Sequence, residues 1–404
     1  MVNKIVYMLS HPLTERDYRR FGIKNAVDNG NNVEVIDLFS LLYPRKDRGK
    51  LQLEFNTNLK IKYINTIFNL RKELNRYNDK DAAVLLYPPG LMFNLIVKIL
   101  NNRSIPVVCV NAGTLPVLRS KKKGKDKNFI FRIFKMYSFR EILSILVVRL
   151  FDLISYFFLK PKVTYFFYGG YKAFEIATKQ LKNAQNLISL HAFDYDLFLG
   201  LEGLNKNIDD SLPKKINKYV VFIDQNLFND PDMYLWGGDS IITDKVKEEY
   251  SRQLNNLFNE IEDKFNYEIV IAAHPRSDYS LDKGCYLGRK IIYGDTPNAI
   301  KNAEICILHS STAINFAVLY KKPIIILEPD VMKDILLPGL LEFLDAMCEA
   351  LNIKKLKTHP NIALDVKIPY VDEEIYADYI NSYIKENNSH DDYFWNCVFR
   401  ELNK

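Results

Sequence analysis

Short apolar runs of strand length alternate with longer, helix-like segments along most of this chain, and this alternation limits its possible folds more than any other feature. In the first half we expect strands at residues 4–9, 33–37, 82–87, 106–110, 163–168 and 187–191. In the second half we expect strands at 219–224, 267–273, 290–293, 304–308 and 323–327, and helices at 243–265, from Pro297, and at 313–320. Strands that alternate with helices form parallel sheets covered by helices. We therefore predict a doubly wound α/β architecture.

The chain is long enough for two such domains. It has 404 residues, and a polar stretch with a proline at 205–216 is a plausible linker. We predict an N-terminal Rossmann-like domain over 1–210 and a second domain over 217–370. A helical segment over 371–404 is expected to pack at the domain junction. The two domains are expected to face each other across a cleft.

Cysteine usage and the first residues indicate the compartment. The five cysteines are odd in number and show no C-x-x-C spacing, which fits a reducing cytoplasm. The apolar part of the N-terminal segment is too short for a signal peptide and is expected to form the first strand. The net charge of +6 is modest, and residues 119–127 hold much of the local positive excess. We expect no nucleic-acid partner.

Residues 119–160 interrupt the α/β pattern with a lysine-rich stretch followed by a long apolar and aromatic segment. Arg149 and Asp152 break the apolar run, so it is a poor transmembrane span. Aromatic side chains beside lysines are typical of a helix that lies in the interface of an anionic membrane. Packing of these helices against the N-terminal sheet is an equally good interpretation.

The most informative residues follow two strands of the second domain. His274-Pro275-Arg276 comes directly after the run 267–273, and Ser310-Ser311-Thr312 comes after the run 304–308. Ligands of open parallel sheets bind outside the carboxyl ends of the strands, so these groups can converge on one anion. The hydroxyl run also opens a helix, whose free N–H groups favour negative charge. The pattern predicts a nucleotide-phosphate site.

Each of these motifs also has a purely structural interpretation. A histidine before proline occurs at His11, His274 and His359, and turn geometry explains some of these. Ser310, Ser311 and Thr312 could serve only to cap a helix, although three hydroxyls exceed what capping needs. Two further turns support a ligand site: Gly294-Asp295-Thr296 after the strand at 290–293, and Asp224-Gln225 after the strand residues 219–223. Asp224 is expected either to hold a ribose or base, or to cap a turn.

Other common motifs are absent from the sequence. There is no P-loop, G-x-G-x-x-G, G-x-S-x-G or H-E-x-x-H pattern, which argues against a kinase, a dehydrogenase, a serine hydrolase and a zinc protease. Asp-x-Asp triplets occur at Asp194–Asp196 and Asp230–Asp232, but no second acidic cluster accompanies them. We therefore expect no metal ligands.

The paired strand–His-Pro and strand–Ser-Ser-Thr motifs resemble those of bacterial GT-B-fold sialyltransferases, which act on surface carbohydrates such as capsule or lipopolysaccharide. The close resemblance covers about residues 219–328; elsewhere it is architectural. It implies a GT-B fold and a CMP-activated nonulosonic acid as donor. It also implies that His274, Ser310, Ser311 and Thr312 engage the donor phosphate.

The chain departs from that family in one respect. The family carries an acidic motif that supplies a general base from the N-terminal domain, and the corresponding strand end here is Gly169-Gly170. A substitute has to come from another strand end of that domain. The candidates follow the first and last strands of that domain: His11, Glu15, Asp17 and Asp194.

Together these features predict an inverting, metal-independent glycosyltransferase. Its donor would be a CMP-nonulosonic acid (sialic, pseudaminic, legionaminic or Kdo-like), bound by the second domain without another cofactor. Its acceptor would be an oligosaccharide or a lipid-linked glycan, and the protein would be cytoplasmic or peripheral on the inner face of the cell membrane. A UDP-sugar epimerase of GT-B fold and a non-catalytic scaffold of a glycan-assembly complex are the alternatives, because fold alone does not separate them.

Overall fold

The computed structural model divides the chain into two compact units. The first comprises Met1–Ala112, Lys125–Phe193 and Lys385–Lys404, and the second comprises Gly113–Gly124 and Asp194–Ile384. The structure describes residues 2–51, 55, 57–87, 89–117, 139–180, 183–204, 218–225, 227, 243–274, 284–332, 338–358 and 366–404. The predicted linker at 205–216 and the lysine-rich stretch lie outside the described residues.

The first unit is built on a seven-stranded parallel sheet of order β3-β2-β1-β4-β5-β6-β7. Its strands are β1 (Lys4–Leu9), β2 (Asn32–Asp37), β3 (Lys60–Tyr63), β4 (Asp81–Leu86), β5 (Val107–Asn111), β6 (Val163–Gly169) and β7 (Ala184–Leu190). The connecting helices are α1 (Glu15–Arg20), α2 (Ile23–Asp28), α3 (Phe39–Leu42), α4 (Ile67–Leu74), α5 (Leu91–Asn101), α7 (Phe139–Leu159) and α8 (Tyr171–Gln180), with a short 3-10 helix at Arg48–Leu51. Strand order reverses direction between β1 and β4, which makes that point the topological switch of the sheet.

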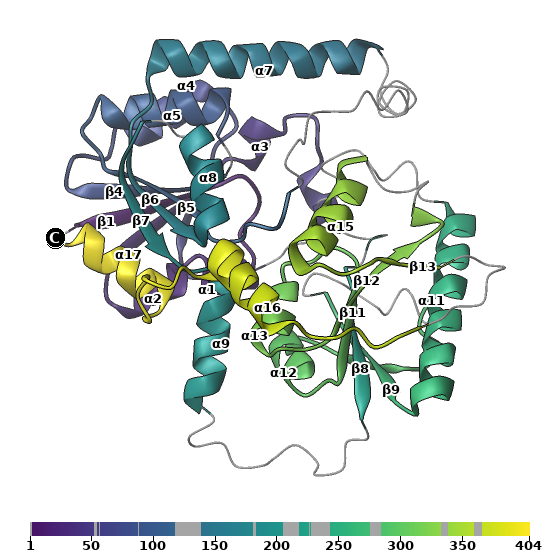
Figure 1. Cartoon of the computed structure of the whole chain (residues 1–404). Coiled ribbons are helices and arrows are strands. Elements are labelled where there is room, and N and C mark those ends of the chain that lie inside the picture. Colours follow the sequence, from purple (N-terminus) through teal and green to yellow (C-terminus); the bar gives the residue numbers. More distant parts are fainter. Residues whose placement is uncertain are drawn as a thin grey trace. The chain divides into compact units, whose positions relative to one another are not determined.

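Successive residues of β1 point to opposite faces of the sheet, so both faces carry an apolar core. Val6 and Met8 pack with α4 and α5, whereas Tyr7 packs with α2 and α17 (Phe394–Leu402). Figure 1 shows α4 and α5 on one side of this sheet and α2 and α17 on the other. The near-continuous apolar sequence of β1 is what a strand buried on both faces requires.

The end of the chain returns to this first sheet. Trp395 of α17 donates from its indole N–H to the carbonyl oxygen of Arg20 at 2.8 Å. The backbone of Gly22 has φ 67, and a Cβ placed there would lie 2.1 Å from Trp395 Cγ, so only glycine permits this close approach. The predicted terminal segment 371–404 is thus divided: residues up to Ile384 belong to the second unit, and Lys385–Lys404 to the first.

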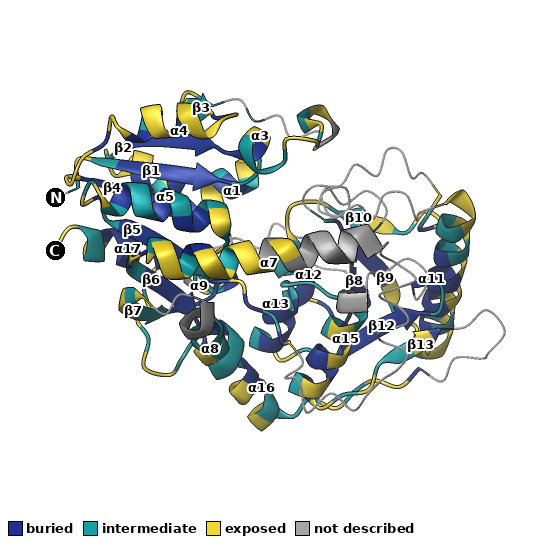
Figure 2. Ribbon diagram, turned by 90° about the horizontal axis from the view of Figure 1, so that it is seen from above, coloured by how far each residue is buried: buried dark blue, intermediate teal, exposed yellow. Residues whose placement is uncertain are grey.

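The second unit is built on a six-stranded parallel sheet of order β10-β9-β8-β11-β12-β13. Its strands are β8 (Tyr219–Ile223), β9 (Glu268–Ala272), β10 (Lys290–Ile292), β11 (Ile305–Leu308), β12 (Ile324–Pro329) and β13 (Leu356–Thr358). Its helices are α9 (Phe193–Leu204), α11 (Asp244–Phe265), α12 (Thr296–Lys301), α13 (Ile314–Leu319), α15 (Pro338–Leu351) and α16 (Glu373–Tyr379), followed by a π turn at Ile380–Ile384. In Figure 2 the inner strands β8 and β12 of this sheet are dark blue, because helices cover both faces.

The prediction of two doubly wound α/β domains is confirmed by these two sheets. The expected strands are present, and β3 and β13 are additional short strands at the edges of the two sheets. The domain boundary differs from the expected one, since the second unit takes over at Asp194 and includes most of α9. Among the described residues, no helix is long and apolar enough to span a membrane.

Candidate functional site

The predicted ligand-binding segments of the second unit lie at one edge of its sheet. The parallel pairing places β8 between β9 and β11, with β10 beyond β9. His274 follows β9, Asp224 and Gln225 follow β8, and Ser310 follows β11. Because strand order reverses between β8 and β11, these segments surround the topological switch point, where open α/β sheets bind ligands.

Hydrogen bonds join the neighbouring strand ends directly. The amide oxygen of Gln225 accepts from the backbone N–H of Ser310 at 2.9 Å, which ties the end of β8 to the end of β11. The N–H of Asp224 donates to the carbonyl oxygen of Ala272 at 3.1 Å, and the N–H of Ala273 donates to Ile292 at 2.9 Å. The ladder therefore continues up to the residues of the site and holds their backbone in place.

The three hydroxyl residues have different surroundings. Ser311 Oγ accepts from the N–H of Ala313 at 3.2 Å, so this hydroxyl does cap the following turn. The hydroxyls of Ser310 and Thr312 make no hydrogen bond within the part of the chain that the structure describes, and both residues are partly exposed. Helix α13 begins at Ile314, one residue later than predicted, so all three hydroxyls lie in the turn before it. Two of the three are available to a ligand, and one has the structural role that the sequence left open.

His274 is a partly buried residue at the end of β9. It is adjacent in the chain to Ala273, whose N–H is held by β10. Arg276 and Pro275 lie outside the described residues, so the predicted cationic contribution of Arg276 stays a prediction.

The turn after β10 is the outermost of the predicted segments. Gly294 and Asp295 are exposed, and Thr296 is the first residue of α12. Asp295 occupies the N-cap position, and its carboxylate accepts from the side-chain amide of Asn298 at 2.9 Å. Gly294 has φ 72, a left-handed backbone that favours glycine. This turn adjoins the site on the side of β9.

A buried histidine that the sequence did not single out lies beneath the hydroxyl residues. His309, at the end of β11, is fully buried, and its Nδ1 lies 2.7 Å from the carbonyl oxygen of Leu327. A carbonyl only accepts, so Nδ1 carries the hydrogen and Nε2 accepts from Tyr250 OH at 2.8 Å. Burial lowers the pKa of His309 to about 4, against the bond to Leu327, which raises it. His309 is therefore neutral at physiological pH and fixes the position of Ser310.

The switch point of the first unit lies between β1 and β4, and two of the predicted base candidates meet just after β1. His11 Nε2 is 3.2 Å from Asp17 Oδ2. Thr14 donates to the same carboxylate oxygen at 2.6 Å and accepts from the N–H of Asp17 at 3.1 Å. A carboxylate oxygen only accepts, so Nε2 carries the hydrogen. When the ring is neutral, Nδ1 is the acceptor, and Ser10 Oγ lies 3.4 Å from it.

The charge of Asp17 is maintained despite its burial. Burial raises the pKa of Asp17. The hydrogen bond and charge of His11 and the hydrogen bond from Thr14 together lower it by a larger amount, so the pKa lies below its usual value. Asp17 is therefore ionised at neutral pH. An ionised carboxylate that orients a partly exposed imidazole is the arrangement expected of a general base.

The strand end that corresponds to the family's acidic motif has no room for a carboxylate. A Cβ at Gly169 would lie 2.4 Å from the backbone of His191 and Ala192. Gly170 has φ 79, in the left-handed region. The close approach of β6 to the segment after β7 thus explains why glycines stand here, and why a base has to come from elsewhere.

The remaining base candidates, Glu15 and Asp194, have other partners. Glu15 is exposed on α1 and pairs with Arg19 at 2.7 Å. Asp194 was expected in the N-terminal domain but belongs to the second unit. It is buried there and accepts from the side-chain amide of Asn315 at 3.0 Å, while Tyr379 OH donates to the oxygen of Asn315 at 3.4 Å. This chain of contacts anchors α9 and α16 on α13.

Metal-binding side chains do not cluster in the described part of the chain, where no group of three or more histidine, cysteine, aspartate and glutamate residues is placed to hold an ion. The Asp230–Asp232 triplet lies outside the described residues.

Comparison with known proteins adds one sequence match. Residues 203–331 match the model of glycosyltransferase family 52. That range contains β8 to β11 and the hydroxyl residues of the site, and the match supports a glycosyltransferase. No curated protein sequence matches the chain.

The solved structures that resemble the chain are distant. MnaA of S. aureus bound to UDP is 14% identical with a TM-score of 0.45, covering 99% of this chain and 97% of that one. The UDP-GlcNAc 2-epimerase of Neisseria meningitidis is 11% identical with a TM-score of 0.45, covering 99% and 100%. The calicheamicin glycosyltransferase CalG4 is 9% identical with a TM-score of 0.42, covering 88% and 85%. Similarities this low carry no argument about chemistry.

Proposed function

We propose that the chain is an inverting glycosyltransferase that moves a nonulosonic acid from its CMP derivative to a surface-glycan acceptor, without a resident metal or other cofactor. The observation that carries the proposal is that His274, Gln225 and Ser310 follow three adjacent parallel strands around the switch point of the second sheet, with Gln225 hydrogen-bonded to Ser310. The segment match to glycosyltransferase family 52 over 203–331 supports it.

In this proposal the second unit binds the donor. The hydroxyls of Ser310 and Thr312 donate to phosphate oxygens of CMP, and the turn around Gly294–Thr296 adjoins the nucleotide. As the bond between the anomeric carbon and the phosphate oxygen breaks, CMP leaves with the bonding electron pair. His274 then donates a proton to the departing phosphate oxygen. Donors that are already in place stabilise the developing charge without reorganisation.

The first unit carries the group that suits the other half of the reaction. Nδ1 of His11 takes the proton from an acceptor hydroxyl as its oxygen bonds to the anomeric carbon, and Asp17 stabilises the resulting imidazolium. Attack on the face opposite the leaving CMP inverts the anomeric centre. The base is therefore a histidine–carboxylate pair rather than the carboxylate of the resembling family.

The acceptor and the place of action follow from the same proposal. An oligosaccharide or a lipid-linked glycan under assembly is the acceptor, and the protein works in the cytoplasm at the inner face of the cell membrane. The lipid-linked form would bring the acceptor to that surface.

Thermal stabilisation by a panel of CMP, CDP, UDP, UMP, GDP and ADP tests the proposal. A ligand that binds only the folded protein raises the melting temperature, by an amount that grows with its concentration relative to Kd. We expect the largest shift with CMP and little with UDP. A preference for UDP or UMP would favour a hexosyltransferase or an epimerase, and no shift with any nucleotide would favour a scaffold.

A further inference from the structure

Helix α7 is amphipathic in the opposite sense to an ordinary surface helix. Its polar side contacts the protein: Asp152 accepts from the N–H of Leu91 at 2.6 Å, and the buried Ser155 accepts from the side-chain amide of Asn94 at 2.8 Å. Both partners belong to α5. A globular protein normally buries the apolar side of such a helix and leaves its polar side in water.

The apolar side of α7 is the side that faces solvent. We define the apolar face of α7 as Leu150, Phe151, Leu153, Ile154, Phe157 and Phe158, all of them exposed. Phe157 and Phe158 are 65% and 82% exposed. Five of the six follow the i, i+3, i+4, i+7, i+8 spacing of a helix stripe that is built to be buried. Figure 2 shows the described part of α7 turned to the viewer with its exposed residues in yellow.

Helix α4, which packs against α5 as α7 does, also exposes apolar side chains. Ile67 and Phe68 on that helix are exposed, Phe68 by 77%, and Leu91 at the start of α5 is exposed beside Asp152. Figure 1 places α4, α5 and α7 on the same side of the first sheet. Exposed apolar side chains in this number on one side of a domain mark a surface that binds a partner.

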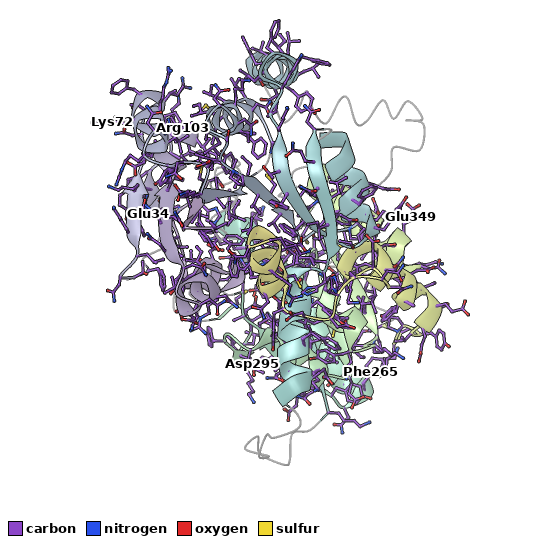
Figure 3. The ribbon with its side chains drawn as sticks, turned by 90° about the vertical axis from the view of Figure 1, so that its left-hand side faces the viewer. Glu34, Lys72, Arg103, Phe265, Asp295 and Glu349 are labelled. Atoms are coloured by element: carbon purple, nitrogen blue, oxygen red, sulfur yellow. The ribbon has the colours of Figure 1, made fainter. Side chains whose placement is uncertain are left out.

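The charges around this surface are mainly positive. Arg71 and Lys72 on α4 and Lys160 after α7 are exposed, and Figure 3 shows Lys72 and Arg103 at the same end of the unit as α7. Arg103 donates to the backbone carbonyl oxygens of Asn75 and Tyr77, which leave its charge uncompensated.

The described acidic side chains of α4, α5 and α7 do not offset these cations. Glu73 is paired with Arg76 at 2.7 Å, and Asp152 is occupied with the N–H of Leu91. Aromatic side chains that enter the boundary of the acyl chains, with cations at the headgroups, are the features by which helices lie on an anionic bilayer.

We propose that the apolar face of α7, with α4 beside it, docks the protein on the surface of an anionic lipid bilayer. Phe157 and Phe158 enter the boundary between headgroups and acyl chains, while Arg71, Lys72 and Lys160 contact anionic headgroups. The proposal does not depend on which donor sugar the protein uses.

Flotation of the full-length protein with vesicles tests this surface. We expect co-flotation with phosphatidylcholine vesicles that contain about 30% phosphatidylglycerol, much weaker binding to pure phosphatidylcholine, and loss of the difference at high salt. The double variant Phe157→Ser/Phe158→Ser should bind about tenfold less. Tyr370→Ser, which removes an aromatic side chain that is 87% exposed in the second unit, is the matched control and should bind like the wild type.

Two results would overturn the proposal. One is absence of binding to either vesicle type. The other is a concentration-dependent dimer that the double variant dissociates, without vesicle binding, because the face would then be an interface between copies of the chain. Turnover with a soluble acceptor should be the same in wild type and double variant, so a failure of docking remains distinguishable from a failure of the proposed function.

Discussion

The two sheets have the same strand order around their switch points, yet they present different chemistry there. Counted from the first strand of each unit, both run 3-2-1-4-5-6, with one more strand in the first. The switch point of the first unit carries an ionisable pair, His11 with Asp17. The switch point of the second carries neutral donors, Ser310 and Thr312, above the buried neutral His309.

The difference shows how one topology serves two tasks. The loop after β1, residues 10–14, lets a carboxylate from α1 return onto a histidine, which suits the movement of a proton. The loop after β11, residues 309–313, has the same length, but it forms the turn before α13 and presents hydroxyls and no formal charge. Topology fixes where a ligand binds, and the residues after each strand decide what the site does.

Of the changes that test this comparison, loss of the proposed leaving-group acid, His274, should have the largest effect. His274→Ala removes the proposed proton donor, so we expect kcat to fall by about 10²- to 10⁴-fold. CMP should still raise the melting temperature of the variant, because the hydroxyls remain. Steady-state kinetics and thermal denaturation of the same preparation provide the check. Near-normal turnover would remove His274 from the mechanism.

The neutral state of the buried His309 can be tested through the stability of the protein. The pKa of His309 is lowered to about 4, so the unfolded chain binds a proton more readily than the folded one. Its contribution to stability is complete above the ordinary histidine pKa and is lost as pH falls through about 4. The change should be on the order of 3 kcal/mol in the free energy of unfolding.

Urea midpoints near neutral pH and at about pH 4 would measure this loss. His309→Gln removes the titrating group and should flatten the pH dependence, whereas His390→Gln, at an exposed histidine, should leave it unchanged. Equal pH dependence in all three proteins would show that His309 is not the group that titrates.

The carboxylate of Asp17 should contribute to the rate of the reaction. Asp17→Asn removes the carboxylate that orients the imidazole of His11. We expect kcat, measured by steady-state kinetics, to fall by about 10- to 100-fold, part of the full acid–base contribution. Because the pKa of Asp17 is lowered, its own contribution to stability is complete at neutral pH and is lost only as pH falls below the usual carboxyl range.

Glu15→Gln is the matched control for that experiment. Glu15 lies on the same helix but is exposed and paired with Arg19. Its loss should leave kcat unchanged. An unchanged kcat in Asp17→Asn would mean that the pair has only a structural role.

The smallest expected effects distinguish the roles of the three hydroxyl residues in CMP binding and in stability. The double variant Ser310→Ala/Thr312→Val should bind CMP about thirtyfold more weakly, since each hydroxyl contributes about 1 kcal/mol. Ser311→Ala should instead lower stability by about 1 kcal/mol and leave CMP affinity nearly unchanged, because Ser311 caps the turn at Ala313. Calorimetric titration and urea denaturation measure the two quantities. A reversed pattern would exchange the roles of these residues.

Most of the fold is predictable because the central strands are buried on both faces. Their apolar runs are continuous and end at turn residues, as in β1 and β8. The edge strands β3 (Lys60–Tyr63) and β13 (Leu356–Thr358) are not predicted, because each is short. Their sequences are also partly polar, because some of their residues are exposed to solvent.

The site is predictable only as far as strand order allows. Residues that follow adjacent strands can be expected together, which locates His274, Gln225 and Ser310. Contacts that depend on the path of a loop are invisible in the sequence: the return of Asp17 to His11, the capping role of Ser311, and the placement of Asp194 beside Asn315. The burial of His309 cannot be predicted from the sequence, because it depends on its contacts with Tyr250 and Leu327, which are distant in the chain.

Release of CMP from CMP-nonulosonic acids is the most direct test of the central claim. Wild-type protein would be incubated with each CMP-sugar, with and without a glycan acceptor, and with UDP-GlcNAc in parallel. The account predicts CMP release that depends on the acceptor and a product with inverted anomeric configuration. Absence of CMP release, together with epimerisation of UDP-GlcNAc, would contradict it.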